Sequence, residues 1–287
     1  MRAAGRSRVS GELLGEAARA WVALGQGLPP GTLRIVLADV DGVITRGEGH
    51  PAELDVLARL GATNAAARTD PRVPAITLCT GRQAPYVELM AQLTGVFLPC
   101  IFEHGGGLFF PTTFRYQFDA RLGADYAARL ARLRAALEQP LIQTGRAFVQ
   151  PGKEATMTLY PLGGTEVREL AALAESAVAR VTPEFSVEAN LRGVEVRPRG
   201  INKGTGATRI AELLEVPLEA MAGVGDSDPD LSFLLLEGIG FSAAPANATS
   251  HVRQAVDYVA RASFGAGLLE IIALVQQRNS KEILTEP

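Results

Sequence analysis

Two carboxylates at the end of an apolar run are the first residues whose types and spacing could do chemistry. Asp39 and Asp41 stand two positions apart and precede Gly42, where a turn can redirect the second side chain. One carboxylate can then attack as a nucleophile while the other serves as general acid and base. The pair also offers the hard oxygen ligands that Mg²⁺ prefers. The alternative is a pair of turn or helix-capping aspartates.

A hydroxyl and a lysine mark two further candidate sites. Thr80 ends another apolar run and is followed by Gly81 and Arg82. A hydroxyl and free N–H groups at a helix start can hold phosphate oxygens, although threonine is also a common helix N-cap. Lys203 begins the helical pattern 203–214, where the helix dipole disfavours a cation. We therefore expect Lys203 to neutralise phosphate or carboxylate charge; a solvated lysine is the alternative.

An acidic turn supplies the last constellation. Asp226, Asp228 and Asp230 fall within five residues, directly after the uncharged run 220–225. Asp226 is the best placed of them to bind a metal ion, and we expect Ser227 and Asp230 to support it. An ordinary aspartate-rich turn is the alternative.

The elements that must position these residues alternate between strand and helix. Five apolar runs have the pattern of strands buried on both faces: 33–39, 76–80, 97–103, 220–226 and 238–242. Helical patterns lie between or after them, at 83–94, 203–214, 229–236 and 265–278. This order predicts an α/β fold, a doubly wound, mostly parallel Rossmann-like core. The candidate polar residues follow strand ends, at the sheet edge where such folds bind ligands.

The stretch 114–198 has a different pattern. A helix at about 122–137 precedes two strand-like runs, 146–150 and 154–160, and a second helix at about 165–181 precedes the runs 185–191 and 193–198. The order αββαββ predicts an inserted α+β domain with a small antiparallel sheet. The predicted organisation is an N-terminal extension (1–32), a first core segment (33–113), the insert (114–198) and a second core segment (199–287).

The N-terminal segment predicts one further helix, and the composition argues against several classes of protein. Residues 11–25 have the spacing of an amphipathic helix, which would either pack on the body of the protein or form a dimer contact. Lys+Arg (28) nearly balances Asp+Glu (31), which argues against a nucleic-acid binder with a broad basic face. No apolar run is long enough for a membrane span. The two cysteines, Cys79 and Cys100, are too few for a disulfide framework, so we expect a cytoplasmic protein. We also expect it to be a monomer or a homodimer.

Four motifs occur in a fixed order: DVDGV after a strand, TGR after a strand, a lysine at a helix start, and GDSDPD after a strand. In this order they resemble the motifs of the haloacid dehalogenase-like hydrolase superfamily, over residues 33–275. The resemblance implies that Asp39 is the nucleophile, Asp41 the general acid and base, and Thr80 the phosphate-binding hydroxyl. It implies that Lys203 stabilises the phosphate charge and that Asp39, Asp226 and the backbone carbonyl of Asp41 hold Mg²⁺. The implied phosphate-binding residues are Asp41, Gly42, Thr80, Gly81 and Lys203.

The motif spacing selects a subtype of this superfamily. Asp39 and Thr80 are 41 positions apart, too close for a large domain between them, whereas 123 positions separate Thr80 from Lys203. This arrangement is similar to the type IIB cap of the Cof-like, sucrose-phosphate and trehalose-6-phosphate phosphatases. A phosphatase acting on a sugar phosphate or a related small metabolite is therefore expected. A phosphomannomutase-like mutase and a non-catalytic sugar-phosphate-binding protein are the alternatives.

Three segments resemble the trehalose-6-phosphate phosphatases in particular: the EHG at 103–105, Lys153 before a strand, and the ExRP and NKG sequences at 195–204. The candidate substrate contacts are Arg82, His104, Lys153, Glu195, Arg197 and Asn202. Four of these six residues have a structural alternative. His104 would be a buried structural histidine, Lys153 a solvated hairpin residue, and Glu195 with Arg197 a surface ion pair.

Overall fold

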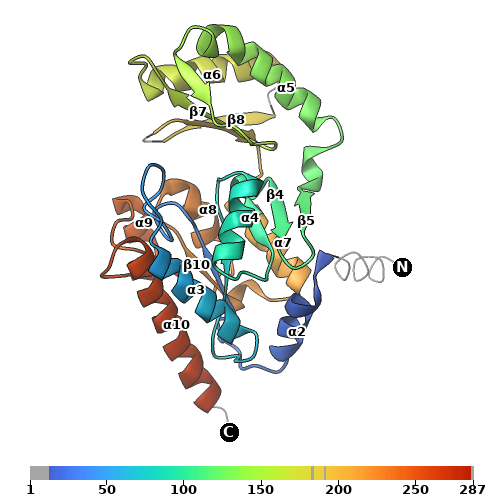
Figure 1. Ribbon diagram of the computed structural model, residues 1–287, viewed down its shortest axis with the longest axis vertical. Coiled ribbons are helices and arrows are strands. Elements are labelled where there is room, and N and C mark those ends of the chain that lie inside the picture. The colour runs from blue at the N-terminus through green and yellow to red at the C-terminus, as the bar shows by residue number, and fades with distance from the viewer. Residues whose placement is uncertain (1–12, 182–183, 191, 286–287) are drawn as a thin grey trace.

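The computed structural model describes residues 13–181, 184–190 and 192–285, and it places a large core beneath a smaller cap (Figure 1). The core is built on a five-stranded parallel sheet with the order β12-β11-β10-β1-β2. Its strands are β1 (Ile35–Ala38), β2 (Ala75–Leu78), β10 (Met221–Val224), β11 (Phe241–Ala244) and β12 (Tyr258–Val259). The prediction of a doubly wound α/β core with an inserted α+β cap is confirmed.

Alternate side chains of β1 show why the sheet is buried on both faces. Val36 and Ala38 belong to one apolar cluster, whereas Ile35 and Leu37 belong to a second cluster on the other face. The first cluster contains side chains from α3 (Leu54–Ala67), α4 (Ala84–Leu93) and α10 (Phe264–Thr285). The second contains side chains from α2 (Glu16–Leu24), α7 (Lys203–Leu214), α8 (Leu231–Leu234) and α9 (Ser250–Ala255). Helices therefore cover both faces of the parallel sheet.

The predicted strand at 97–103 does not join the central sheet. Its observed part, β3 (Cys100–Phe102), forms a separate antiparallel sheet with β4 (Gly107–Phe110) and β5 (Arg115–Phe118). One parallel bridge, between Cys79 and Ile101, connects it to the end of β2. The chain reverses at Glu103 and His104, whose φ angles are +47° and +55°, and this reversal lets β4 take up the hydrogen bonds of β3.

The cap is a four-stranded antiparallel sheet with two helices packed on one face. The strand order is β6-β7-β9-β8, with β6 (Ala147–Val149), β7 (Met157–Pro161), β8 (Phe185–Ala189) and β9 (Val194–Pro198). The helices are α5 (Tyr126–Leu137) and α6 (Val167–Val181). The side chains of β7 alternate between faces: Met157 and Leu159 enter the apolar cluster beneath these helices, whereas Thr158 and Tyr160 face the core. The cap therefore presents a polar sheet face to the core.

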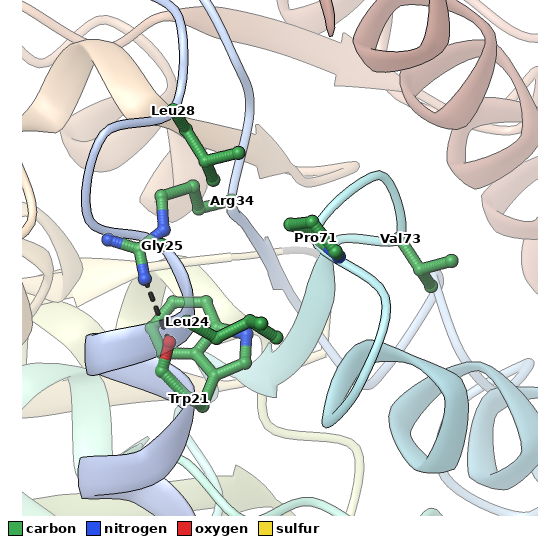
Figure 2. Close-up of a pocket in the computed structure, with 7 residues that line it drawn as sticks. All are labelled: Trp21, Leu24, Gly25, Leu28, Arg34, Pro71 and Val73. Carbon is green, nitrogen blue, oxygen red and sulfur yellow. Dashed lines mark hydrogen bonds between the residues drawn. The ribbon is translucent and has the colours of Figure 1, made fainter.

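The amphipathic pattern at 11–25 corresponds to α2, although residues 11–12 lie outside the described part of the chain. Trp21 of this helix is buried in the core, and the Arg34 guanidinium lies 4.4 Å from its ring (Figure 2). Arg34 also donates a hydrogen bond of 3.1 Å to the Trp21 carbonyl oxygen. The cavity lined by these residues holds only about 10 Å³, too little for a substrate. The helix thus packs on the body of the protein, one of its two predicted roles.

None of the helices formed by the described residues is both long and apolar enough to cross a membrane.

Candidate active site at the carboxyl edge of the sheet

The polar residues that follow β1, β2 and β10 line one cleft of about 920 Å³ between the core and the cap. The cleft brings together most of the predicted site residues: Asp39, Asp41, Gly42, Thr80, Gly81, Arg82, His104, Lys153, Glu195, Arg197, Lys203, Asp226 and Ser227. The carboxyl ends of neighbouring parallel strands meet at one edge, and this geometry explains why residues so distant in sequence converge. Asp230 and Asn202 are the two predicted residues that do not line the cleft.

Lys203 lies at the centre of the buried cluster. Its Nζ is 2.9 Å from Asp39 Oδ1 and 2.5 Å from Asp230 Oδ1, and the lysine is only 2% exposed. Burial alone would lower the pKa of Lys203, but the charges of Asp230 and Asp39 raise it above its ordinary value. The lysine is therefore a fixed cation beside Asp39, and the alternative of a solvated lysine is wrong.

Asp230 is fully buried and positions both Lys203 and the turn that carries Asp226. While Oδ1 faces Lys203, Oδ2 accepts hydrogen bonds of 2.9 Å from the backbone N–H groups of Asp226 and Ser227. The Ser227 hydroxyl donates a third hydrogen bond to the same oxygen, at 3.1 Å. Both oxygens of Asp230 are thus occupied by the protein itself.

Asp39 and Asp226 have the properties of carboxylates that require a cation. Oxygen atoms of Asp39, Asp226 and Asp230 lie within 4.8 Å of one another, and the buried Oδ1 of Asp226 has no hydrogen-bond partner among the described residues. Burial, followed by the charge of Asp230, raises the pKa of Asp39 well above its ordinary value and that of Asp226 to about 7. Since Asp230 is already engaged, the donor set that fits a divalent metal consists of Asp39 and Asp226.

Gly42 makes this approach of the two loops possible. A Cβ atom built at Gly42 would lie 2.1 Å from Asp226 Oδ2, and the glycine has a φ angle of +86°. Its N–H donates to the Thr45 carbonyl oxygen at 2.8 Å, so this N–H is already engaged. The position therefore supplies space for the Asp226 carboxylate rather than a free donor.

The Asp41 side chain pairs with Arg82. Arg82 Nε lies 2.7 Å from Asp41 Oδ2, and a second guanidinium nitrogen lies 2.7 Å from Oδ1. The same guanidinium is 3.1 Å from a Glu48 oxygen and lies over the ring of Tyr86. A contribution of Asp41 to a metal site would therefore come from its backbone carbonyl.

Thr80 and Gly81 form the floor of the cleft beside Asp39. The buried Thr80 hydroxyl accepts a hydrogen bond of 3.2 Å from the Arg82 backbone N–H. A Cβ atom at Gly81 would lie 2.2 Å from His104 Nε2, so the imidazole packs directly on bare backbone.

A second buried cluster lies opposite, on the polar face of the cap. Lys153 Nζ is 3.3 Å from Glu195 Oε2 and also contacts the Thr158 hydroxyl. His104 Nε2 of the core is 3.7 Å from the same Glu195 oxygen. Burial would raise the pKa of Glu195, but Lys153 and His104 lower it to about 2, whereas burial lowers the pKa of His104. Lys153 is 3% exposed, so the alternative of a solvated hairpin lysine is wrong.

Three predicted substrate residues are engaged with other residues of the protein. Glu195 and Arg197 do not form the surface pair that was the alternative, because Glu195 pairs with Lys153 and Arg197 with Glu188. Asn202 is the N-cap of α7: its side chain accepts a hydrogen bond of 2.9 Å from the Thr205 N–H. The Asn202 side chain is therefore used in starting the helix that carries Lys203.

Sequence reasoning missed several polar residues that line the cleft, chiefly Glu48, Gln150, Tyr160 and Arg192. Tyr160 lies two positions after Thr158 on β7, and the alternation of strand faces could have placed it in the cleft. Glu48 and Arg192 lie in loops outside the named helices and strands, where no periodicity signals which way a side chain points.

Comparison with known proteins defines the class. The family model of haloacid dehalogenase-like hydrolases matches residues 165–272. The solved structure of protein 0175 of Thermoplasma acidophilum superposes with a TM-score of 0.66 and 18% identity, covering 85% of this chain and 99% of that one. The sucrose-phosphatase of Synechocystis superposes with a TM-score of 0.62 and 16% identity, covering 85% and 98%. The chain is thus similar to haloacid dehalogenase-like hydrolases in sequence and in fold, the resemblance that its motifs predicted.

Among characterised sequences, the chain is similar to phosphoglycolate phosphatases. That of Methanosarcina acetivorans is 25% identical over 249 residues, which cover 85% of this chain and 96% of the relative. That of Methanothrix thermoacetophila is 44% identical over 79 residues, 28% of this chain and 35% of the relative. The chain is thus similar in sequence to enzymes named as phosphatases.

Proposed function

We propose that the protein is a Mg²⁺-dependent phosphomonoester hydrolase that cleaves a sugar phosphate or a related small phosphorylated metabolite. The observation that carries this proposal is the buried cluster at the cleft floor. Asp39 lies 2.9 Å from a fixed lysine and beside Asp226, whose Oδ1 is buried without a hydrogen-bond partner among the described residues. A carboxylate held between a cation and an incomplete metal site is suited to attack a phosphate dianion.

Asp39, Asp226 and the backbone carbonyl of Asp41 would hold the metal ion. Mg²⁺ would supply positive charge that offsets the repulsion between the Asp39 carboxylate and the phosphate. Thr80, the backbone at Gly81, and Lys203 would bind the phosphoryl oxygens. These residues all line the cleft, and Lys203 Nζ lies 2.9 Å from Asp39 Oδ1.

The chemistry proceeds in two steps on the chain's own side chains. Asp39 attacks phosphorus in line, so that an aspartyl-phosphate forms and the bond to the leaving oxygen breaks while Asp41 gives that oxygen a proton. Asp41 then takes a proton from water, which attacks the same phosphorus, releases phosphate and regenerates Asp39. The cap excludes bulk water during these steps and contacts the leaving group.

The cap wall favours a polar leaving group. Lys153, Glu195 and His104 present hydrogen-bonding groups at the cleft, a combination suited to the hydroxyls of a sugar. A second candidate, a small phosphorylated acid such as phosphoglycolate, is supported by the named relatives and by Arg192. Among the described residues, Arg192 is a cleft-lining arginine that makes no ion pair with an acid, and it could bind a carboxylate.

The substitution Asp39→Asn tests the proposal. We expect turnover of p-nitrophenyl phosphate to fall by at least about 10³-fold, with the fold intact by circular dichroism. Asp70→Asn is the matched control, because Asp70 is a partly exposed aspartate that pairs with Arg72 and does not line the cleft. Near-normal activity of the Asp39→Asn variant would overturn the assignment.

Product analysis separates the two alternatives. A phosphomannomutase-like enzyme would convert a sugar phosphate to its isomer without releasing phosphate. A non-catalytic binding protein would bind a panel of sugar phosphates, phosphoglycolate and phosphoglycerate without hydrolysing any member. Release of free phosphate excludes both, and the same panel identifies the substrate. A cytoplasmic location and a monomeric or homodimeric state stay predictions.

A further inference from the structure

Glu48 is a single carboxylate that connects the core to the cap. It lies in the core loop between β1 and α3, where its Oε1 is 3.1 Å from an Arg82 nitrogen. The same oxygen accepts a hydrogen bond from the Tyr160 hydroxyl of β7 and another, at 3.3 Å, from the Gln150 side chain. Tyr160 and Gln150 both belong to the cap segment. These hydrogen bonds from the cap therefore help to fix the position of the Glu48 carboxylate.

Arg82 is shared between this carboxylate and the proposed general acid and base. Its guanidinium faces both oxygens of Asp41 at 2.7 Å while it contacts Glu48 with another nitrogen. The arginine side chain is 15% exposed, so its ion pairs are little weakened by solvent. With two N–H groups on its two oxygens, Asp41 has its best-directed lone pairs occupied and cannot pass a proton to a leaving group in this arrangement.

We propose that Glu48 is a positioning residue for the general acid and base. Held by Tyr160 and Gln150 of the cap, it offers Arg82 a second carboxylate, so that Arg82 can release Asp41 when the leaving oxygen of a substrate approaches. The inference rests on the proposed phosphatase function and adds to it a link between cap docking and proton transfer. Glu48 itself acts only through Arg82.

Proton donation to the leaving group gives the role a specific readout. A phenol that is already acidic leaves without a proton, whereas a less acidic phenol needs one. The substrates are therefore p-nitrophenyl phosphate and phenyl phosphate, which differ in leaving-group acidity but present the same phosphate. The quantity measured is kcat/KM, because it reports the steps up to the first phosphoryl transfer.

For Glu48→Gln we expect kcat/KM with phenyl phosphate to fall about tenfold more than with p-nitrophenyl phosphate. Tyr160→Phe, which removes one of the cap's donors to Glu48, should show the same pattern with a smaller ratio. Glu53→Gln is the matched control: Glu53 pairs with Arg46 at 3.0 Å on the same loop but does not line the cleft. Its ratio should equal that of the wild type.

An equal loss with both substrates, or no loss with either, would overturn the role of Glu48. If Glu48→Gln does not fold, as judged by thermal unfolding, the ratio for Tyr160→Phe decides in the same way. Failure of the wild-type protein to hydrolyse either phosphate in the presence of Mg²⁺ would instead overturn the proposed function. The two failures are thus distinguishable.

Discussion

The cleft has two walls that each contain a buried lysine, and their charge balances differ. On the core side, Lys203 faces three acids, Asp39, Asp226 and Asp230. On the cap side, Lys153 makes an ion pair with one acid, Glu195. The pKa shifts follow this difference, because burial raises the pKa of Asp39 and Asp226 while Lys153 helps to lower that of Glu195 to about 2. The core wall therefore carries an excess of acid that a divalent cation would balance, whereas the ion pair of the cap wall balances itself and would suit a neutral polar group.

Metal removal should have the largest effect, because the core wall has more carboxylates than its one lysine can neutralise. Chelation with EDTA should lower turnover by about 10²-fold or more, since a bound metal ion supplies several kcal/mol of charge stabilisation. Independently of activity, Mg²⁺ at 100 times its Kd should stabilise the fold by about 2.7 kcal/mol in thermal unfolding. Asp226→Asn should abolish this stabilisation. A Mg²⁺-induced stabilisation that persists in the Asp226→Asn variant would place the metal elsewhere.

The pH dependence of the stability of the metal-free protein tests the same excess of acid. The pKa of Asp226 is raised from 3.8 to about 7, so the folded protein keeps a proton that the unfolded chain releases. Because the folded state binds more protons, stability is expected to fall as pH rises from about 4 to about 7, by on the order of 3 kcal/mol. Urea unfolding in EDTA at pH 5 and pH 8 measures this. Asp226→Asn should flatten the slope, and a wild-type slope of opposite sign would contradict the imbalance.

The balanced cap wall predicts the opposite pH behaviour. The pKa of Glu195 is depressed to about 2 from an ordinary value of 4.5, so its contribution is complete above about pH 4.5 and is lost as pH falls toward 2. Glu195→Gln should cost on the order of 2–3 kcal/mol in urea unfolding at pH 7, and less at pH 3. Glu188→Gln is the control: Glu188 is half-exposed and pairs with Arg197, so it should cost under about 1 kcal/mol. An equal cost for both variants would contradict the comparison.

The smallest expected effect concerns Asn202, between the two walls in sequence but engaged in a helix cap. Asn202→Ala should lower stability by about 1 kcal/mol, because the N–H of Thr205 loses its acceptor. The KM for the substrate should stay within about twofold, and Asn202→Ser should restore most of the stability. A large increase in KM with little loss of stability would instead make Asn202 a substrate contact.

The core wall was more predictable from sequence than the cap wall, for a physical reason. Asp39, Thr80 and Asp226 directly follow buried strands, and parallel strands bring their carboxyl ends together. The same apolar pattern predicts the strands of the central sheet except β12. It does not predict β4 and β5, and it places β3 in the central sheet instead of the separate antiparallel sheet. Both the polar character of a residue beyond a strand end and its place directly after an apolar run can be read from the amino-acid sequence.

The contacts of Glu48, by contrast, could not be predicted from sequence. Its partner Tyr160 is 112 positions away and reaches it from another domain. The pairing of Arg82 with Asp41 depends on which of several acids the guanidinium meets once the loops are folded. Such choices rest on side-chain rotamers and on how the cap docks, and neither leaves a period or a spacing in the chain.

Bare backbone at two points of the cleft has a consequence for how the enzyme can change. Gly42 lies against the Asp226 carboxylate, and Gly81 lies against the His104 ring, with no room for a side chain at either position. Neither glycine has a side chain to contribute there, so a search for reacting side chains would pass over both. In a library of random variants, however, these two positions should tolerate substitution as poorly as the carboxylates beside them. Directed evolution toward new substrates would therefore find its freedom in the side chains of the cap rather than in these loops.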